Sequence, residues 1–274
     1  MKKIIISLIL LSAVVFSFAE TLVIKGSNTV FPIAQRWVEE LKKERPDLDI
    51  SLEGQGSSTG IAALFNNTAD VANSSRWLKS SEIEKMNKEG QFFAPIIVAY
   101  DGIALIVNKS LKIDELSIDT LKKIYTGEIT TWNQIDPNLP KNQIVKYTRN
   151  TASGTYETFE GFVLGGAKMD PRARVVESTQ VELDSVSKNP NAIAYVGVGY
   201  VDDSVKVIKV NGILPTKSNI LTNTYPISRP LYMFINVKNG YPMSGKIKEY
   251  INFGLSRRGQ EIVEEVGYVA AYGY

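Results

Sequence analysis

The chain repeats one local pattern: a short apolar run, a turn rich in Gly, Ser, Thr and Asn, and a segment whose apolar residues have helical spacing. Alternating strands and helices of this kind predict an α/β fold, with helices layered on a mostly parallel sheet. The carboxyl ends of parallel strands meet at one edge of the sheet, where the next helices begin and where ligands bind. We therefore expect the polar turns to lie close together. These turns are Ser27–Thr29, Ser57–Thr59, Ser74–Arg76 and Arg149–Thr155.

The fourth turn, Arg149–Thr155, has the richest set of groups for binding an anion. It follows the strand-like run Ile144–Thr148 and precedes a segment with helical spacing. Unpaired backbone N–H groups and the positive end of a helix dipole are therefore expected at this turn. Ser153 and Thr155 add hydroxyls, and Arg149 adds a permanent positive charge with a planar fork of donors. A single turn of this type also fits a plain helix cap, but four that converge favour a site for a small tetrahedral oxyanion.

Residues 1–19 have the features of a signal peptide. Lys2 and Lys3 precede the apolar run Ile4–Phe16, and Ser17-Phe18-Ala19 has the small residues found before a cleavage point, so we expect cleavage after Ala19. The apolar run is too short to favour spanning a membrane. Because the chain has no Cys, we expect no lipid anchor and no disulfide. The sequence therefore predicts an exported protein of a bacterial periplasm.

The composition argues against several classes of protein. The chain has 31 Lys and Arg and 29 Asp and Glu, and loss of Lys2 and Lys3 with the signal peptide makes the two sets equal. We therefore expect neither nucleic acid nor an anionic membrane surface as a partner. The chain has no His, so a Ser-His-Asp or Cys-His nucleophile cannot form and most zinc sites lose their usual ligands. We expect no metal, no cofactor and no enzyme activity.

Two long apolar runs indicate how the chain is divided. They are Phe92–Asn108 and Tyr225–Asn236, and strands of such length are unusual in a compact domain. A strand that leaves one lobe and enters a second would explain each of them. We expect a discontinuous first lobe of residues 20–101 and 231–274, and a second lobe of residues 102–230.

Local spacing predicts where two of the helices lie. Ile33, Trp37 and Leu41 repeat on one helical face, which predicts a helix packed on the sheet. Thr179 and Glu182 have the spacing of a capping box, which predicts a helix that begins at this point.

Six segments along the mature chain together resemble one known family. They are Gly26–Pro32, Gly54–Gly60, Ala69–Arg76, Asp101–Ala104, Ile124–Ile129 with Trp132, and Arg149–Thr155. Jointly and in this order they make the chain similar to the periplasmic phosphate-binding proteins that serve phosphate-specific ABC transporters. The resemblance covers nearly the whole mature chain.

The resemblance implies a two-lobed periplasmic binding protein of type II. Each lobe would be a mostly parallel sheet flanked by helices, and two crossing strands would join the lobes, which close on dehydrated phosphate. The implied function is high-affinity binding of inorganic phosphate and its delivery to the membrane permease subunits of an ABC transporter. We expect such a protein to be a monomer.

The resemblance also assigns roles to individual residues. Thr29, Val30 and Phe31 would contact phosphate, partly through backbone N–H groups, and Ser57 matches the serine of the second turn. The residues that match the second lobe's binding motif are Arg149, Ser153, Gly154 and Thr155.

This chain departs from the best-known branch of that family at two positions. Ser75 stands where a carboxylate would accept a hydrogen bond from the phosphate O–H, and Thr151 stands where an Asp would orient the arginine. We keep Ser75 as a binding residue, with Asp101, Ser58 and Arg76 as further candidates. Asp101 could accept the phosphate proton, or it could simply pair with backbone at the hinge.

Two alternatives to phosphate binding are open at this point. A binding protein for sulfate, molybdate or tungstate would use the same architecture, because these oxyanions only accept hydrogen bonds and a pocket of donors suits them. A phosphate-ester hydrolase is the remote alternative, since it needs a metal cluster or a nucleophile with a base.

Overall fold

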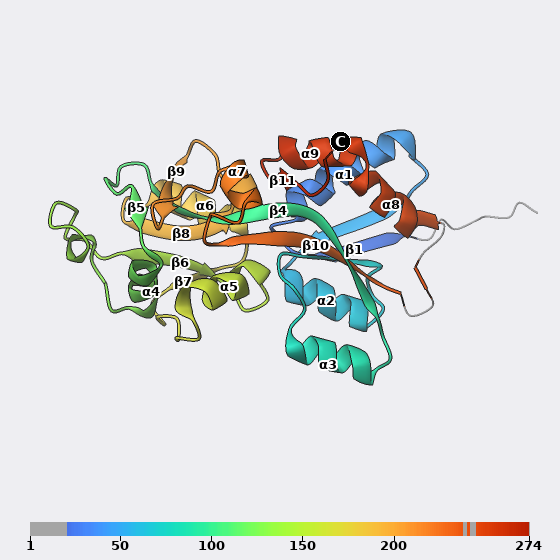
Figure 1. Ribbon diagram of the computed structural model, residues 1–274, viewed down its shortest axis with the longest axis horizontal. Helices are drawn as coiled ribbons and strands as arrows, with labels where there is room; N and C mark the ends of the chain where they lie inside the picture. Colours follow the sequence, from blue (N-terminus) through green and yellow to red (C-terminus); the bar gives the residue numbers. More distant parts are fainter. Residues whose placement is uncertain (1–20, 238–239, 242–244, 274) are drawn as a thin grey trace, which may run out of the picture.

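The computed structural model describes residues 21–237, 240–241 and 245–273. The predicted signal peptide, residues 1–19, lies outside the described residues. The described chain forms two lobes side by side along the long axis of the molecule (Figure 1), and two strands, β4 (Phe93–Asn108) and β10 (Ser228–Asn236), run through both. β4 is 16 residues long. The prediction of two long segments that cross between lobes is therefore confirmed.

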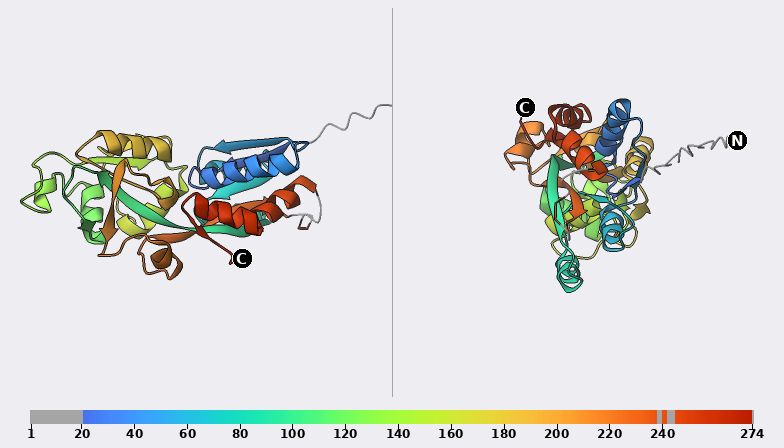
Figure 2. Two further views of the ribbon diagram at one scale, coloured as in Figure 1. Left: turned by 90° about the horizontal axis from the view of Figure 1, so that it is seen from above. Right: turned by 90° about the vertical axis from the view of Figure 1, so that its right-hand side faces the viewer.

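The first lobe contains the N-terminal strand and the C-terminal helices. Besides its parts of β4 and β10, its elements are β1 (Leu22–Gly26), α1 (Phe31–Glu44), β2 (Ile50–Gly54), α2 (Ser57–Phe65), β3 (Val71–Ser74), α3 (Ser80–Lys88), α8 (Gly245–Leu255), α9 (Arg257–Glu265) and β11 (Val269–Ala270). The sheet order is β2-β1-β3-β10-β4, with β11 also paired to β4. α1, α8 and α9 cover one face of the sheet, and α2 and α3 cover the other (Figures 1 and 2).

The helix α1 shows why the sequence forms these layers. Ile33, Trp37 and Leu41 are buried on one face of it, as their spacing predicts. The indole N–H of Trp37 donates to the Gly259 carbonyl at 2.8 Å, so the ring is buried with its polar group satisfied.

The second lobe is built by the middle of the chain. Its elements are β5 (Glu115–Leu116), α4 (Ile118–Thr126), β6 (Val145–Arg149), α5 (Gly154–Phe159), β7 (Arg174–Val176), α6 (Thr179–Lys188), β8 (Ala192–Gly197), β9 (Val205–Val210) and α7 (Lys217–Leu221). The sheet continues from β4 through β8 and β6 to β7, and β9 pairs with β4 and β5. A π-helical segment, Glu160–Leu164, continues α5. α4 and α5 pack on one side of the sheet and α6 on the other.

The strand directions refine the predicted architecture. The pairs β1–β2, β1–β3, β6–β7, β6–β8 and β5–β9 are parallel. The pairs that include β4 or β10 are antiparallel. Mostly parallel pairing thus holds for the outer strands alone, because the two strands that connect the lobes run in opposite directions through the middle of the sheet.

The apolar core divides between the lobes at the crossing strands. One buried cluster takes its members from residues 22–99 and 231–268, and another from residues 103–227. We propose lobe boundaries at 101/102 and 230/231 on this basis.

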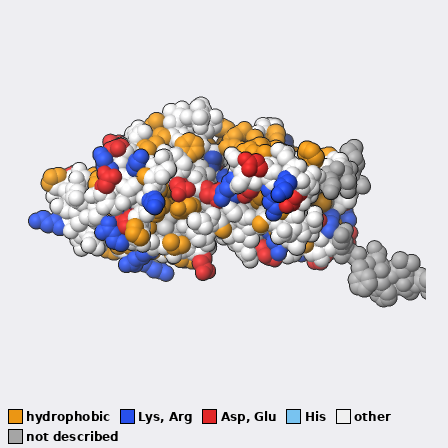
Figure 3. Space-filling model, turned by 90° about the horizontal axis from the view of Figure 1, so that it is seen from below, with side chains coloured by type: hydrophobic (Ala, Val, Ile, Leu, Met, Phe, Trp, Pro, Cys, Tyr) orange, Lys and Arg blue, Asp and Glu red, His pale blue; other side chains and the backbone are white. Residues whose placement is uncertain are grey.

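The molecular surface carries charges of both signs. On the face drawn in Figure 3, Lys and Arg side chains are interspersed with Asp and Glu over both lobes. In the part of the chain that the structure describes, no helix has the length and apolar character needed to cross a membrane.

Candidate functional site

The polar turns meet at a buried place between the two lobes. The Oγ1 atoms of Thr29 and Thr155, which come from different lobes, lie 2.8 Å apart. The hydroxyl oxygens of Ser57 and Ser75 lie 3.3 Å apart, and the Ser75 N–H donates to Ser57 Oγ at 3.0 Å. All four side chains are buried. The structure therefore gathers hydroxyls, which can both donate and accept hydrogen bonds, where the sequence predicted that the turns would converge.

Gly154 brings the start of α5 directly against these hydroxyls. A Cβ atom at this position would lie 2.7 Å from Ser75 Oγ and would also overlap the Ser57 hydroxyl. Nearby, the Ser58 N–H donates across the lobes to the Ala152 carbonyl at 3.1 Å. The N-terminal ends of α2 and α5, with their partial positive charge, therefore face one another across the site, and no side chain fits at position 154.

Ser153 and Thr155 flank Gly154 and have different partners. Ser153 is the N-cap of α5, and its Oγ accepts the Tyr156 N–H at 3.3 Å. Thr155 Oγ1 accepts a hydrogen bond from Arg229 Nη2 at 2.9 Å. Ser153 thus has the cap role that Ser commonly takes, and its hydroxyl hydrogen stays available as a donor.

The first turn directs its backbone N–H groups to its own oxygen atoms. Ser27 Oγ accepts from the N–H of Thr29 at 3.1 Å and of Val30 at 3.4 Å. The N–H of Phe31 donates to the Ser27 carbonyl at 3.1 Å and to the Asn28 carbonyl at 3.2 Å. An anion bound through these N–H groups would therefore have to share or replace the bonds within the turn.

Arg149 lies beside this cluster, and oxygen atoms of both lobes hold its guanidinium. Its Nε donates to the Val176 carbonyl at 3.2 Å and its Nη2 to the Glu177 carbonyl at 2.7 Å. Its Nη1 donates to Thr179 Oγ1 and its Nη2 to Asn28 Oδ1, both at 3.0 Å. Arg149 is buried and so connects β6 of the second lobe to the first turn of the first lobe.

The beginning of α6 differs from the sequence prediction. Ser178 is the N-cap, and its Oγ accepts the Val181 N–H at 3.2 Å. The predicted capping box of Thr179 and Glu182 is therefore wrong, because Thr179 follows the cap and accepts from Arg149 instead. Glu182 is fully buried, and within the described part of the chain neither of its carboxylate oxygens has a hydrogen-bond partner. Burial raises the pKa of Glu182 to about 8, and the positive charge of Arg149 partly opposes this rise.

Sequence reasoning missed a second buried arginine at the site, Arg229 on β10. Its Nε and Nη2 both donate to Asp101 Oδ2, at 2.9 and 2.8 Å. Its Nη1 donates to the Ser75 carbonyl at 3.0 Å, and its Nη2 also reaches Thr155. The other Asp101 oxygen accepts the Val198 N–H at 3.0 Å. Burial raises the pKa of Asp101, while Arg229 and the Val198 N–H oppose the rise.

The sequence did contain a signal for this pair. Asp101 and Arg229 each interrupt one of the two long apolar runs. A charged residue inside a buried strand is strongly destabilising unless an opposite charge pairs with it. Two crossing strands with one such residue each therefore predict that the two side chains meet.

Arg76 and Ser58 belong to a cluster of charges that spans the lobes. The Arg76 guanidinium contacts both carboxylate oxygens of Glu82 at 2.8 Å and, through Nε, Glu157 of α5 at 2.6 Å. Ser58 Oγ accepts from Arg76 at 2.9 Å and donates to Glu157 at 3.0 Å. Lys79 Nζ lies 2.7 Å from Glu157. Glu157 is thus the second lobe's contribution to a charge cluster whose other members come from the first lobe.

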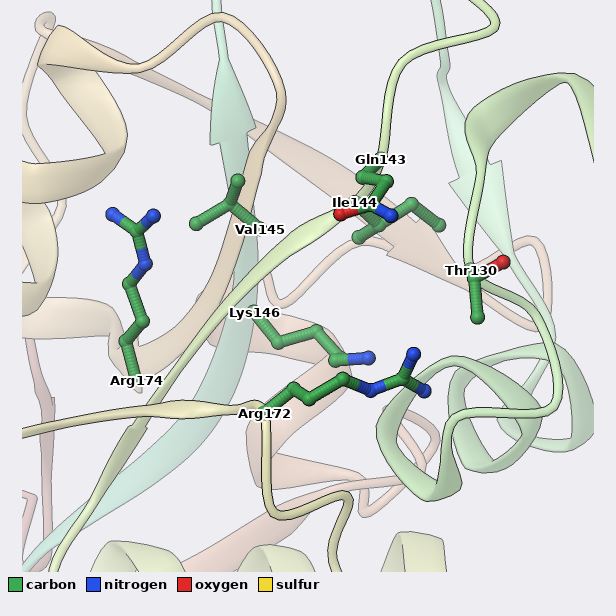
Figure 4. A pocket seen from close by; sticks show the side chains of 7 residues that line it. All are labelled: Thr130, Gln143, Ile144, Val145, Lys146, Arg172 and Arg174. Atoms are coloured by element: carbon green, nitrogen blue, oxygen red, sulfur yellow. The ribbon is translucent and has the colours of Figure 1, made fainter.

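A basic pocket on the second lobe is separate from this site (Figure 4). Its volume is about 100 Å³, it lies beside β6 and β7, and Lys146, Arg172 and Arg174 bring three cations to it. Lys146 Nζ and Arg172 Nε contact the same carboxylate, that of Asp170, at 2.5 and 2.9 Å. The Asp170 carboxylate therefore offsets part of the positive charge of this pocket.

Comparison with known proteins identifies the family. Residues 18–258 match the model of the PBP superfamily domain. The phosphate-binding protein PstS of Staphylococcus saprophyticus is 32% identical over 254 residues, which are 89% of this chain and 78% of that protein. PstS of Staphylococcus aureus strain USA300 is 33% identical over 255 residues, 90% of this chain and 77% of that protein. The chain belongs to the PstS family.

Solved structures have the PstS-type fold seen here. A phosphate ABC transporter substrate-binding protein from Clostridium perfringens, solved with bound phosphate, is 32% identical and superposes with a TM-score of 0.83. The match covers 92% of this chain and 100% of that protein's chain. An ABC-type phosphate transport receptor from Vibrio cholerae is 30% identical with a TM-score of 0.72, over 90% of this chain and 99% of its own. Among the described residues of our chain, no group of three or more Asp and Glu is placed to hold a metal ion.

Proposed function

We propose that this protein binds inorganic phosphate between its two lobes and delivers it to the permease subunits of an ABC transporter. The observation that carries the proposal is the buried convergence of hydroxyls from both lobes, with Arg229 beside them and the N-terminal ends of two helices facing them. Such donors can replace the water around a small anion. The PstS relatives and the phosphate-bound Clostridium perfringens structure support the same ligand.

The proposed ligand contacts come from all four polar turns. Hydroxyls or backbone N–H groups of both lobes would surround the anion, and Arg149 would compensate its charge together with Arg229. The proposed binding residues are Thr29, Val30, Phe31, Ser57, Ser75, Arg149, Ser153, Gly154, Thr155 and Arg229. Ser58 and Arg76 would act at the rim instead, because their side chains belong to the charge cluster with Glu157.

We assign the distinction between phosphate and fully ionised oxyanions to Asp101. Near neutral pH phosphate keeps at least one proton, whereas sulfate has none. A buried carboxylate can accept a hydrogen bond from that proton and disfavours an anion that offers none. Asp101 is buried, and two hydrogen bonds connect it to the hydroxyl cluster, because Arg229 donates both to Asp101 and to Thr155. Ser75 is the weaker candidate, since a hydroxyl can also turn and donate.

We also propose export to the periplasm, cleavage after Ala19, no lipid anchor, no enzyme activity and a monomeric state. The support is the charged and apolar pattern of residues 1–19 and the absence of Cys and His from the sequence. Export agrees with the proposed binding function, since a carrier must remain in the compartment that the permease faces.

Isothermal titration of the purified mature protein tests the proposed ligand. We expect saturable one-to-one binding of phosphate and much weaker binding of sulfate, molybdate or tungstate under the same conditions. Preferential binding of sulfate, or no heat with any of these anions, would overturn the proposal.

A further inference from the structure

Glu182 on α6 is a buried carboxylate that is not among the proposed phosphate contacts. Its side chain is fully buried, and its two oxygen atoms have no hydrogen-bond partner among the described residues. An unpaired buried carboxylate is costly, and proteins usually retain one only where it has a charged neighbour or a role. The charged group that acts on Glu182 is the guanidinium of Arg149.

The surroundings of Glu182 contain few groups that could compensate its charge. Arg149 comes from β6, Tyr195 from β8 and Tyr125 from α4, and Glu182 raises the pKa of both phenols in addition to the effect of burial. The hydroxyl oxygen of Tyr195 lies within hydrogen-bond distance of Thr148 Oγ1, at 2.6 Å. Arg149 is thus the only one of these neighbours that carries a positive charge.

The hydrogen bonds that hold Arg149 are made to groups other than Glu182. The donors of Arg149 bond the carbonyls of Val176 and Glu177 and the side chains of Thr179 and Asn28. The carboxylate therefore acts on Arg149 through charge rather than through geometry. When Glu182 is ionised, the pair is close to neutral, and when Glu182 is protonated, Arg149 is a cation without a counter-charge.

We propose that Glu182 sets the effective charge of Arg149, so that phosphate binding is coupled to the uptake of a proton by Glu182. A bound anion beside Arg149 takes over the role of counter-charge, and a second negative charge on Glu182 is then unfavourable. This inference rests on the proposed phosphate site. It assigns to Glu182, which does not contact the anion, control over how affinity depends on pH.

The direction of the effect follows from the protonation states. Glu182 is mostly protonated below pH 8 and mostly ionised above it. Above pH 8 the anion must therefore bind together with a proton, so affinity should fall by up to about tenfold for each further pH unit. Protonation of phosphate itself adds its own pH dependence, and that contribution is the same for any variant at this position.

Calorimetric titration with inorganic phosphate from pH 7 to 9.5 tests the proposal, with wild type, Glu182→Gln and Glu182→Met compared. Asp184→Asn is the matched control, because Asp184 is an exposed carboxylate on the same helix. We expect the ratio of wild-type to Glu182→Gln affinity to fall with pH above 8, and the control to follow wild type. Repeating the titrations in buffers of different ionisation enthalpy should show a proton uptake by wild type that exceeds the uptake of either Glu182 variant.

The outcomes separate this inference from the proposed function. A constant affinity ratio with equal proton uptake would overturn the role of Glu182 and leave phosphate binding intact. Absence of phosphate binding by wild type would overturn the proposed function itself. Failure of both uncharged variants to fold would also contradict the inference, because it would show that the carboxylate is required by the structure.

Discussion

Asp101 on β4 and Arg229 on β10 stand directly opposite one another in the antiparallel ladder that joins the lobes, and two hydrogen bonds to one carboxylate oxygen connect them. Cross-strand neighbours on one face are close enough for such a pair. Because Arg229 also reaches Thr155 and the Ser75 carbonyl, the pair connects the joint between the lobes with polar turns of both lobes.

Removing one member of this pair should destabilise the protein more than removing both. Asp101→Leu and Arg229→Met each leave a buried charge unpaired, and we expect each to cost about 3–5 kcal/mol of unfolding free energy. The double variant should lose far less than the sum, since no buried charge remains. Urea denaturation of the ligand-free protein measures all three, and additive losses would show that the two charges do not stabilise one another.

Asp101→Asn should change ligand preference as well as affinity. The amide can no longer act as a negatively charged acceptor for the phosphate proton, so phosphate binding should weaken. The difference between the affinities for phosphate and for sulfate should therefore become smaller. Competition titrations with the two anions measure this difference. Full retention of the preference for phosphate would rule out this role for Asp101.

Gly154→Ala should block the approach of the two lobes without unfolding either. The added methyl would collide with the hydroxyls of Ser57 and Ser75, while Ala is a better helix former than Gly by about 1 kcal/mol. We expect loss of phosphate binding, a thermal stability of the ligand-free protein no lower than that of wild type, and no decrease in the radius of gyration when phosphate is added. Gly161→Ala is the control, since a Cβ there would meet no atom within 4 Å. Normal binding by Gly154→Ala would mean that this close approach is not needed.

Glu157→Gln should shorten the lifetime of the closed protein. The variant loses the negative charge that the second lobe contributes beside Arg76 and Lys79. We expect closure to weaken by about 2 kcal/mol, at the lower end of the range for truncating one partner of a buried charge pair. Stopped-flow measurement should show faster phosphate release. Glu84→Gln, at an exposed carboxylate of α3, is the control and should release phosphate at the wild-type rate. Equal release rates for the two variants would show that Glu157 does not stabilise the closed protein.

Glu182 should also make stability depend on pH. The folded protein keeps a proton on Glu182 up to about pH 8, whereas a free glutamate loses it near 4.5. Between these values the folded state binds more protons than the unfolded chain, so the free energy of unfolding should fall with rising pH, by at most about 1.4 kcal/mol per unit. Glu182→Gln should remove this slope. Denaturant unfolding at a series of pH values measures it, and identical slopes would contradict the assignment.

Much of the fold could be predicted because it depends on local patterns. The buried face of α1 and the crossing strands follow from apolar spacing and run length. The antiparallel middle of the sheet could not be read in this way, since strand direction depends on where the chain goes after it leaves a lobe.

The site was less predictable, because its side chains choose between partners that lie far apart in sequence. Thr179 and Glu182 have the spacing of a cap, yet in the fold they lie near Arg149, and Ser178 becomes the cap. Arg76 follows a polar turn as an anion ligand would, yet it pairs with Glu82 and Glu157. Arg229 could have been found, had the two charges in the apolar runs been considered together.

The pairing of β4 with β10 also bears on how such a protein can evolve. Gly102 lies opposite Ser228, so the chain enters and leaves the second lobe at neighbouring points of a single ladder. The second lobe resembles a long insertion into the first lobe, and the pairing of β4 with β10 holds the two ends of this insertion side by side. A segment of different length or shape could be exchanged there while the N-terminal and C-terminal halves of the host stay in register.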